Sequence, residues 1–308
     1  MKILVLGAGG IGGYFGGRLA EAGADATFLV RPKRREQIAA HGLVIESPIG
    51  NLRIAAKTVV AEELAPAYDL VLFTCKAYDL DSAMDAIAPA MQGSCAVLPL
   101  LNGLAHFDRL DARFGAAAVI GGTCQINVAL APDGTVKHME PLNRFLFGER
   151  DGTRSARAQA LADALAKTSI DWVWSPDILQ DLWEKLMFLS ALAAVTCLFR
   201  GNVAEILAAP GGRAVVERCL AANIAILKAE GRPPREPILK WAQERLLTPG
   251  PASASMMRDM EAGKPVEADH IVGHMLALAR RHGIDDTVLA MAHAHLLTYE
   301  ARRAAGRL

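Results

Sequence analysis

Six consecutive residues near the start of the chain have the types and spacing of a dinucleotide-binding loop. They are Gly7, Ala8, Gly9, Gly10, Ile11 and Gly12, which fit the pattern GxGxxG. The first glycine of such a loop allows a tight turn, the second lets the main chain approach a pyrophosphate, and the third lets the helix lie close to the strand. Because the apolar run KILVL precedes the loop and a helical stretch follows it, the phosphates would face a helix N-terminus. The alternative is a glycine-rich turn without a ligand.

The end of the second expected strand indicates which dinucleotide the loop would bind. Sites for NAD or FAD usually carry Asp or Glu about 20 residues past the glycines, where the carboxylate bonds the ribose hydroxyls. Here the strand ends in Arg31, and Lys33, Arg34 and Arg35 follow. Since Arg31 can pair with a 2′-phosphate that an acid would repel, the sequence predicts NADPH as the cofactor. The alternative is a solvated basic helix start, which fits Arg34 and Arg35 better than Arg31.

Three further polar residues could act on a bound substrate. Lys76 in TCKA and Asn102 in LLNG each follow an expected strand. Ligands of open α/β sheets bind at the carboxyl ends of the strands, so both side chains would face the cofactor. The alternative for each alone is a surface turn residue. Lys185 in WEKL opens a long apolar run, and its alternative is a lysine that extends from an apolar helix to solvent.

The elements that would position these residues alternate between short apolar runs and helical stretches in the first half of the chain. This alternation predicts an α/β domain with a mostly parallel, doubly wound sheet. The expected strands are 2–6, 26–30, 69–74, 96–100 and 119–124, and the expected helices are 10–22 and 33–41. A turn at Pro132-Asp133-Gly134 predicts a hairpin within 125–148, which could extend the parallel sheet with antiparallel strands.

From residue 176 onward the pattern is helical, and glycines mark the ends of the helices. The expected helices are 176–199, 211–229, 235–247, 253–260, 267–282 and 286–303. The sequence therefore predicts two domains. Residues 1–175 would form an NADP-binding Rossmann domain, and residues 176–308 an all-α domain for substrate binding and dimerisation.

Composition narrows the class of protein. The 308 residues hold 33 Lys and Arg against 33 Asp and Glu, so the charge gives no support for binding to nucleic acid or to a membrane. Five cysteines without a CxxC pair indicate reduced, mostly buried thiols and a cytoplasmic protein. His270 and His274 are four residues apart but lack a third ligand at suitable spacing, so we expect no metal and place both on a solvated helix face.

Taken together, the motifs resemble those of the ketopantoate reductase family, the 2-dehydropantoate 2-reductases, within the group of 6-phosphogluconate-dehydrogenase-like folds. The resemblance covers essentially the whole chain. It rests on GAGGIG at the N-terminus, CKAYD around Lys76, LNGL around Asn102, LWEKL around Lys185, and SASMMRDMEAGKPVEAD near the C-terminus. It implies NADPH-dependent reduction of the ketone of a 2-oxoacid, as in the step from ketopantoate to pantoate in pantothenate biosynthesis.

The resemblance also implies roles for the matching residues. Lys185 would be the general acid that protonates the ketone oxygen, and Glu267 would hold that lysine and contact cofactor and substrate. Ser255 would bond the substrate carboxylate, while Lys76 and Asn102 would position nicotinamide, ribose and substrate. Without the resemblance, Ser255 is a residue of a helix surface and Glu267 an acid favoured by a helix dipole.

Two positions depart from the ketopantoate-specific pattern, which has asparagines four and eight residues after the catalytic lysine on one helix face. Here those positions are Leu189 and Ala193, and neither side chain can donate a hydrogen bond. A site without partners for a substrate hydroxyl loses its best means of discrimination. We therefore expect a substrate more apolar than ketopantoate.

Two other functions stay open at this point. One is an NADPH-binding regulator that has lost turnover, although a mere binder needs no proton donor such as Lys185. The other is a related dehydrogenase that oxidises a hydroxy or amino acid, although Arg31 favours NADPH and therefore reduction. The apolar C-terminal helices permit a homodimer.

Overall fold

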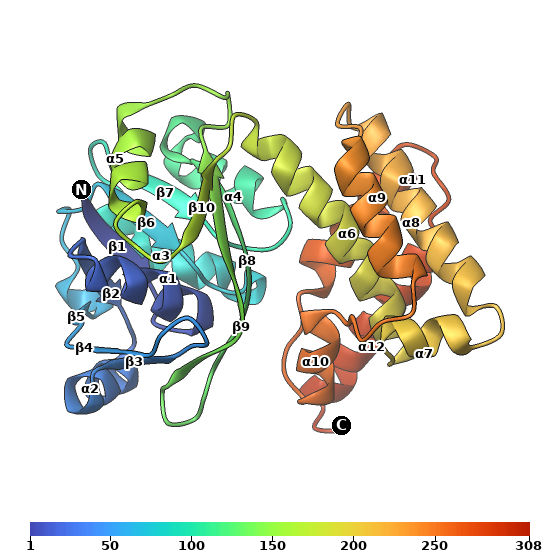
Figure 1. Cartoon of the computed structure of the whole chain (residues 1–308), viewed down its shortest axis with the longest axis horizontal. Helices are drawn as coiled ribbons and strands as arrows, with labels where there is room; N and C mark the ends of the chain where they lie inside the picture. Colours follow the sequence, from blue (N-terminus) through green and yellow to red (C-terminus); the bar gives the residue numbers. More distant parts are fainter. The chain divides into compact units, whose positions relative to one another are not determined.

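A computed structural model describes all residues 1–308 as two compact units. Unit 1 comprises Met1–Leu101 and His106–Leu179, and unit 2 comprises Asn102–Ala105 and Gln180–Leu308. Every strand belongs to unit 1, and unit 2 is helical (Figure 1). The expected combination of an α/β part and an all-α part is thereby confirmed. The domain bounds of 1–175 and 176–308 stay a prediction.

Unit 1 contains a parallel sheet of five strands in the order β5-β2-β1-β6-β7. The strands are β1 (Lys2–Leu6), β2 (Asp25–Leu29), β5 (Lys57–Val59), β6 (Leu70–Phe73) and β7 (Ala96–Pro99). Their helices are α1 (Gly10–Glu21), α2 (Pro32–His41), α3 (Leu80–Ile87) and α4 (His106–Phe114). Since β6 and β7 are buried on both faces, they read in the sequence as short unbroken apolar runs. The strand order changes direction at β1, which places a ligand crevice at the carboxyl ends of β1, β2 and β6.

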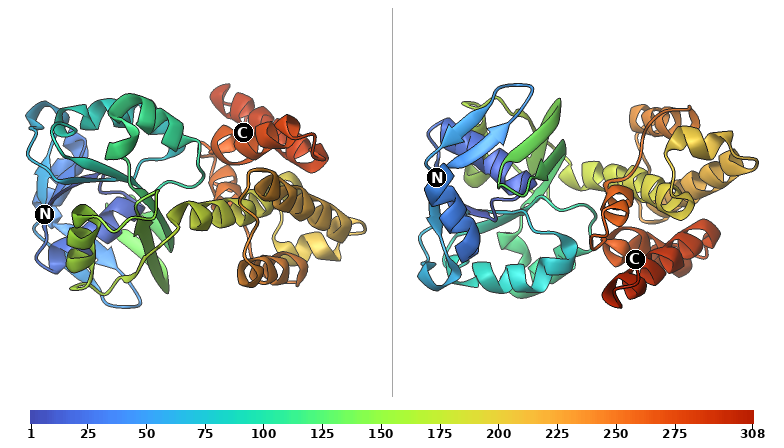
Figure 2. Two further views of the ribbon diagram at one scale, coloured as in Figure 1. Left: turned by 90° about the horizontal axis from the view of Figure 1, so that it is seen from above. Right: turned by 90° about the horizontal axis from the view of Figure 1, so that it is seen from below.

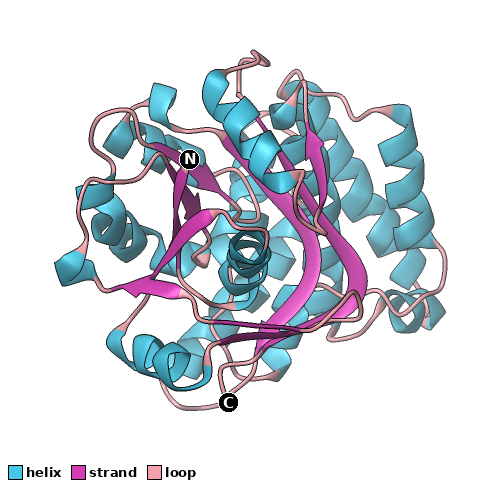
Figure 3. Ribbon diagram, turned by 60° about the vertical axis from the view of Figure 1, so that its left-hand side comes forward, coloured by secondary structure: helices cyan, strands magenta, loops and turns pink.

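The remaining strands form a second sheet, in the order β10-β9-β3-β4 with β8 paired to β9 (Figure 3). They are β3 (Leu43–Glu46), β4 (Leu52–Ile54), β8 (Gly121–Leu130), β9 (Val136–Gly148) and β10 (Asp171–Trp174). The predicted hairpin is confirmed as the antiparallel pair of β8 and β9, but the expectation that it extends the parallel sheet is wrong. Of the strand expected at 119–124, Val119 and Ile120 contact the parallel sheet at Val97, and the residues from Gly121 onward belong to β8.

Aromatic packing explains why the hairpin joins a separate sheet. Phe145 on β9 lies edge-on to Phe15 on α1, with ring centroids 5.2 Å apart. Phe147 stacks on Trp174 of β10 at 6.0 Å. Because Phe15, Phe145 and Phe147 are all buried, pairing β9 with the parallel sheet would remove these rings from the core. Helix α1 accordingly packs on strands of both sheets.

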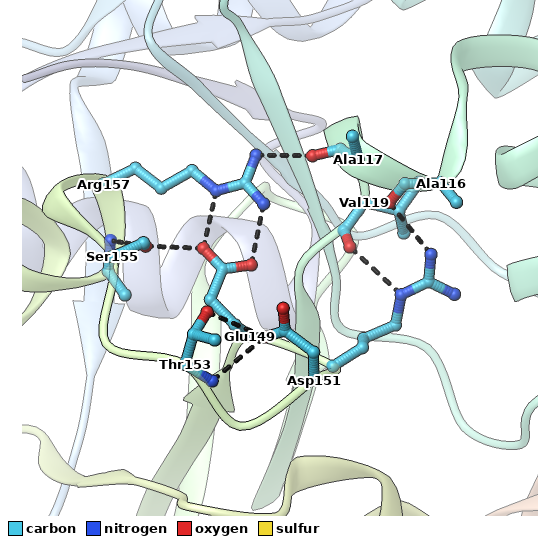
Figure 4. A network of polar contacts seen from close by, with 10 residues as sticks. Ala116, Ala117, Val119, Glu149, Asp151, Thr153, Ser155 and Arg157 are labelled. Carbon is cyan, nitrogen blue, oxygen red and sulfur yellow. Dashed lines mark hydrogen bonds and ion pairs between the residues drawn. The ribbon is translucent and has the colours of Figure 1, made fainter.

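A buried carboxylate fixes the turn from β9 into α5 (Ala156–Leu165). Glu149 is 6% exposed and accepts two hydrogen bonds of 2.7 Å from Arg157 and one of 2.5 Å from Ser155 (Figure 4). Ser155 also caps α5 by accepting a hydrogen bond from the amide of Ala158. Burial opposes ionisation of Glu149, but the hydrogen bonds outweigh it and hold the pKa below its ordinary value.

Unit 2 consists of helices (Figure 2). They are α6 (Ile178–Phe199), α7 (Val203–Ala208), α8 (Gly212–Ala229), α9 (Glu236–Leu247), α10 (Ser255–Glu261), α11 (His274–Arg281) and α12 (Thr287–Ala304). A π-helical turn, η5 (Asp269–Gly273), precedes α11. The predicted helices are confirmed, with the stretch 267–282 divided between η5 and α11. Helix α7 was not predicted, and a capping box of Asn202 and Glu205 starts it.

Helix α6 is long and apolar enough to cross a membrane by length and composition, but 67% of its most apolar window is buried inside the protein. Such burial is typical of a core helix in a soluble protein. Near its start, Glu184 is 3% exposed and pairs with Arg235, which also contacts Asp181. Gln180 donates to Glu184 at 3.1 Å. These contacts tie the first turns of α6 to the segment before α9.

None of the five cysteines forms a disulfide, in agreement with the prediction of reduced thiols. Four are buried, and Cys75 is partly exposed. Burial raises the pKa of the Cys197 and Cys219 thiols to about 12, so neither forms a reactive thiolate near neutral pH.

Replacing Arg157 with alanine tests the Glu149 network. The variant leaves a buried carboxylate without its cation, so we expect a loss of about 2–3 kcal/mol at pH 7, below the 3–5 kcal/mol of a fully buried pair because Arg157 is partly exposed. The depressed pKa of Glu149 stabilises the wild type above the unfolded pKa, and that contribution disappears as pH falls through the folded pKa. The difference in urea unfolding should therefore shrink in acid.

The matched control is Arg144→Ala, which breaks the exposed pair between Arg144 and Asp171. Exposed pairs contribute about 0–1 kcal/mol, so the control should lose no more than that. Equal losses in the two variants at pH 7 would contradict a special role for the buried carboxylate.

Candidate functional site

A pocket of about 870 Å³ lies at the carboxyl ends of β1, β2 and β6 in unit 1. Its size falls within the roughly 300–1,000 Å³ of small-molecule sites. The pocket is lined by residues of the glycine loop, the end of β2 and the segment after β6, among them Gly7, Gly9, Arg31, Arg34, Thr74 and Lys76. It occupies the crevice that the change in strand order predicts.

The glycine loop brings the N-terminus of α1 to this pocket. Gly7 adopts a left-handed φ of 86°, and a side chain at Gly12 would collide with the Gly7 carbonyl oxygen and the Thr74 hydroxyl. By contrast, a Cβ on Gly9 would meet no atom within 4 Å, so the space beside the helix N-terminus is open. Gly10 and Ile11 form the first turn of α1, whose amide groups have no partners within the helix. The loop therefore fits a pyrophosphate.

Two arginines after β2 line the same pocket. Arg31 is exposed and precedes α2 as its N-cap residue. Arg34 is half-buried, and its Nε donates to the Ala8 carbonyl of the glycine loop at 3.1 Å. Its Nη2 atom is buried without a hydrogen-bond partner, and burial lowers the pKa of the guanidinium. A buried cationic donor of this kind fits an anionic ligand.

The alternative of a solvated helix start therefore does not describe Arg34, whereas Arg35 forms an exposed pair with Glu63 at 2.6 Å. The position of Arg34 in the sequence could have indicated this location. Arg34 lies about one helical turn after Arg31, at the start of α2 and on the same side of the helix.

The two polar residues predicted after strands belong to different units. Lys76 is exposed, follows β6, and lines the pocket with the glycine loop. Asn102 follows β7, but the segment Asn102–Ala105 makes its contacts with unit 2. The structure thus groups Lys76 with Arg31, and Asn102 with the residues of unit 2.

In unit 2, one face of α6 carries the predicted lysine and an apolar stretch. Lys185 is partly exposed, Leu189 one turn later is partly exposed, and Ala193 is 2% exposed. Thr196 returns to this face about 16 Å along the axis from Lys185. Its hydroxyl accepts a hydrogen bond from the Ala254 amide at 3.3 Å, so the start of α10 lies against α6 there.

Ser255 is the first residue of α10 and is exposed. It directly follows Ala254, whose amide is bonded to Thr196. The apolar stretch of Leu189 and Ala193 consequently separates Lys185 from the end of α6 at which Ser255 lies.

Glu267 is only 8% exposed, in the turn that leads into η5. Helix α12 fixes the preceding residues, since Tyr299 donates to the Lys264 carbonyl at 2.7 Å and Glu300 accepts from the Val266 amide at 2.8 Å. A buried carboxylate requires polar partners, so the alternative of a surface acid favoured by the helix dipole does not describe this residue.

His270 lies one turn after Glu267 and is partly buried, although it was expected on a solvated face; for this residue that expectation is wrong. The ring is hydrogen-bonded to the main chain of Asn102. Burial lowers the pKa of His270, while Glu267 acts in the opposite direction. The spacing in the sequence could again have indicated this location, because His270 lies three residues after Glu267, a candidate acid of the site. No group of three or more His, Cys, Asp or Glu side chains is arranged to hold a metal ion.

Comparison with known proteins agrees with this geometry. The family model described as "Ketopantoate reductase PanE/ApbA" matches residues 3–152, and that of its C-terminal part matches residues 177–300. An uncharacterized oxidoreductase of Bacillus subtilis, YkpB, is 38% identical over 98% of this chain and 100% of its own. A 2-dehydropantoate 2-reductase of Mesorhizobium japonicum is 32% identical over 91% of this chain and 92% of its own.

Among solved structures, a PanE/ApbA family ketopantoate reductase from Ralstonia eutropha matches with a TM-score of 0.89. It is 25% identical, and the match covers 99% of this chain and 100% of that one. The resemblance inferred from the motifs is confirmed. The chain belongs to the ketopantoate reductase PanE/ApbA family, and it is an oxidoreductase that acts on CH–OH and C=O groups with a nicotinamide cofactor.

Proposed function

We propose that this enzyme is an NADPH-dependent reductase of a 2-oxoacid whose side chain is more apolar than that of ketopantoate. The observation that carries the proposal is the face of α6, where Leu189 and Ala193 follow Lys185. Polar residues at these two positions would be needed to bond a substrate hydroxyl.

The glycine loop and the two arginines would hold the cofactor. The amides at the start of α1 would bond the pyrophosphate, and Arg31 and Arg34 would pair with the 2′-phosphate. Lys76, Asn102 and Glu267 would contact the ribose and nicotinamide. When bound, the reduced nicotinamide supplies a hydride to the carbonyl carbon of the substrate.

Lys185 would act as the general acid. Reduction of a ketone places negative charge on its oxygen, and a lysine with an ordinary pKa near 10.4 is protonated at pH 7. Its ammonium group can stabilise that charge and then donate the proton, an effect typically of about 10²–10⁴ in rate. Glu267 would keep the lysine charged and oriented. Ser255 would bond the substrate carboxylate.

Ketopantoate itself is the second candidate substrate. The relative in Mesorhizobium japonicum, named as a 2-dehydropantoate 2-reductase, supports it. This substrate would place the enzyme in pantothenate biosynthesis. For either substrate we propose a cytoplasmic enzyme and, from the apolar helices of unit 2, a homodimer.

A panel of 2-oxoacids tests the substrate. With NADPH, we expect kcat/KM for aliphatic and aryl 2-oxoacids to exceed that for ketopantoate, measured by the loss of reduced-nicotinamide absorbance. Lys185→Ala should lower kcat by about 10²–10⁴. Lys240→Ala, which removes an exposed lysine of α9, should leave the rate unchanged. In addition, Leu189→Asn should shift preference toward ketopantoate. If kcat/KM of the wild type for ketopantoate is far above that for every apolar 2-oxoacid, the proposal is wrong.

The arginines test the cofactor. Arg31→Ala and Arg34→Ala should each raise KM for NADPH by about tenfold or more, because a hydrogen bond to a charged group contributes about 1.5–3 kcal/mol. KM for NADH should change little. Since Arg34 also holds Ala8, its variant is judged by the ratio of the two KM values. Arg35→Ala is the control, as that side chain pairs with Glu63. Equal use of NADH and NADPH by the wild type would argue against the assignment.

A further inference from the structure

The loop that carries Asn102 packs against the imidazole of His270. Residues Asn102–Ala105 pack with unit 2, although the residues before and after them belong to unit 1. Gly103 in this loop is buried and adopts a φ of 86°. A Cβ there would lie 2.9 Å from Cδ2 and 3.2 Å from Nε2 of His270, and 3.0 Å from its carbonyl oxygen. The loop therefore lies flat against His270, which leaves no room for a side chain.

The ring also forms a specific polar contact with the loop. The hydrogen bond between His270 and the Asn102 main chain favours the protonated ring, which identifies the main-chain carbonyl as the acceptor. The Cδ2–Nε2 edge is the part of the ring nearest Gly103. A leucine or phenylalanine would fill similar space but could not donate this hydrogen bond.

The backbone that presents His270 is itself fixed on its other side. Oδ1 of Asp269 accepts a hydrogen bond of 2.7 Å from Nε2 of His293 on α12. A Cβ on Gly273 would lie 2.8 Å from the same His293 nitrogen, so the π turn packs tightly against α12. Such π turns recur at functional sites, because the wider turn changes the direction in which side chains leave the helix.

We propose that His270 is a positioning residue, whose ring holds the Asn102–Gly103 loop at a fixed place beside the turn that carries Glu267. The proposal rests on the roles assigned above to Asn102 and Glu267. His270 touches the main chain of Asn102, and it lies near enough to Glu267 for the two charges to interact. It thereby sets the spacing between an amide and a carboxylate that would contact the same bound molecules.

Three variants test this role. His270→Ala removes the ring and the donor, whereas His270→Gln keeps a side-chain N–H donor. His282→Gln is the matched control, since His282 lies at the end of α11 and bonds Glu230. Without any ligand, hydrogen exchange of residues 102–105 should accelerate in His270→Ala, recover partly in His270→Gln, and stay unchanged in the control.

Kinetics supply the second readout. A displacement of about 1 Å at a site can cost on the order of 10²-fold, so kcat/KM of His270→Ala should fall by about tenfold to a hundredfold. His270→Gln should recover much of the loss. KM for NADPH should rise only in those variants in which hydrogen exchange of residues 102–105 also accelerates.

Two results would overturn the proposal: unchanged exchange of residues 102–105 in His270→Ala, or a His270→Gln variant as impaired as His270→Ala. If His270→Ala does not fold, the His270→Gln variant tests the proposal by itself. Fast hydrogen exchange of residues 102–105 in that variant, which keeps a donor, would contradict the positioning role. The exchange experiment needs no turnover. A wild type that reduces no 2-oxoacid would therefore refute the proposed function and leave the test of the loop contact intact.

Discussion

Unit 1 depends on how closely α1 approaches the ends of β1 and β6. One methyl group at Gly12 would meet the Gly7 carbonyl and the Thr74 hydroxyl, and would push the helix N-terminus away from the sheet. That hydroxyl donates to the Leu6 carbonyl at 2.6 Å and so joins the two strand ends. Because the approach is this close, the positive end of the helix dipole lies within the crevice, and Arg34 reaches the loop from the side of β2.

In unit 2, the corresponding constraint is the burial of α6. A charged side chain that is buried with this apolar helix needs polar partners. Glu184 has them in Arg235 and Gln180. Burial opposes the ionisation of Glu184, yet these bonds hold its pKa below the ordinary value. The carboxylate next to Lys185 in sequence therefore serves to anchor the helix. Glu267, which we propose as the partner of this lysine, comes instead from a turn that α12 holds through Tyr299.

The sequence predicted those parts of the fold that follow from local periodicity. The parallel strands β1, β2, β6 and β7 and the long helices were found, because buried runs and helical repeats are visible without knowledge of neighbours. Strands β4 and β5, with three residues each, are too short to show a period. The sheet that β9 joins was misjudged because it depends on Phe145 and Phe147 meeting rings from α1 and β10. The partial burial of Arg34 and His270 was not predicted for the same reason: it comes from the glycine loop and the Asn102 loop, which are distant in sequence.

In the function proposed above, two free-energy effects on the face of α6 would set the preference between substrates. A substrate hydroxyl placed beside Leu189 and Ala193 loses its bonds to water and gains none from those side chains, at a cost of about 1–3 kcal/mol. An apolar group in the same place gains about 0.8 kcal/mol for each buried CH₂. Both effects would act in one direction, so the proposed preference for an apolar 2-oxoacid would need changes at only these two positions. On this proposal, the residues that we assign to acid–base chemistry and to cofactor binding would stay the same.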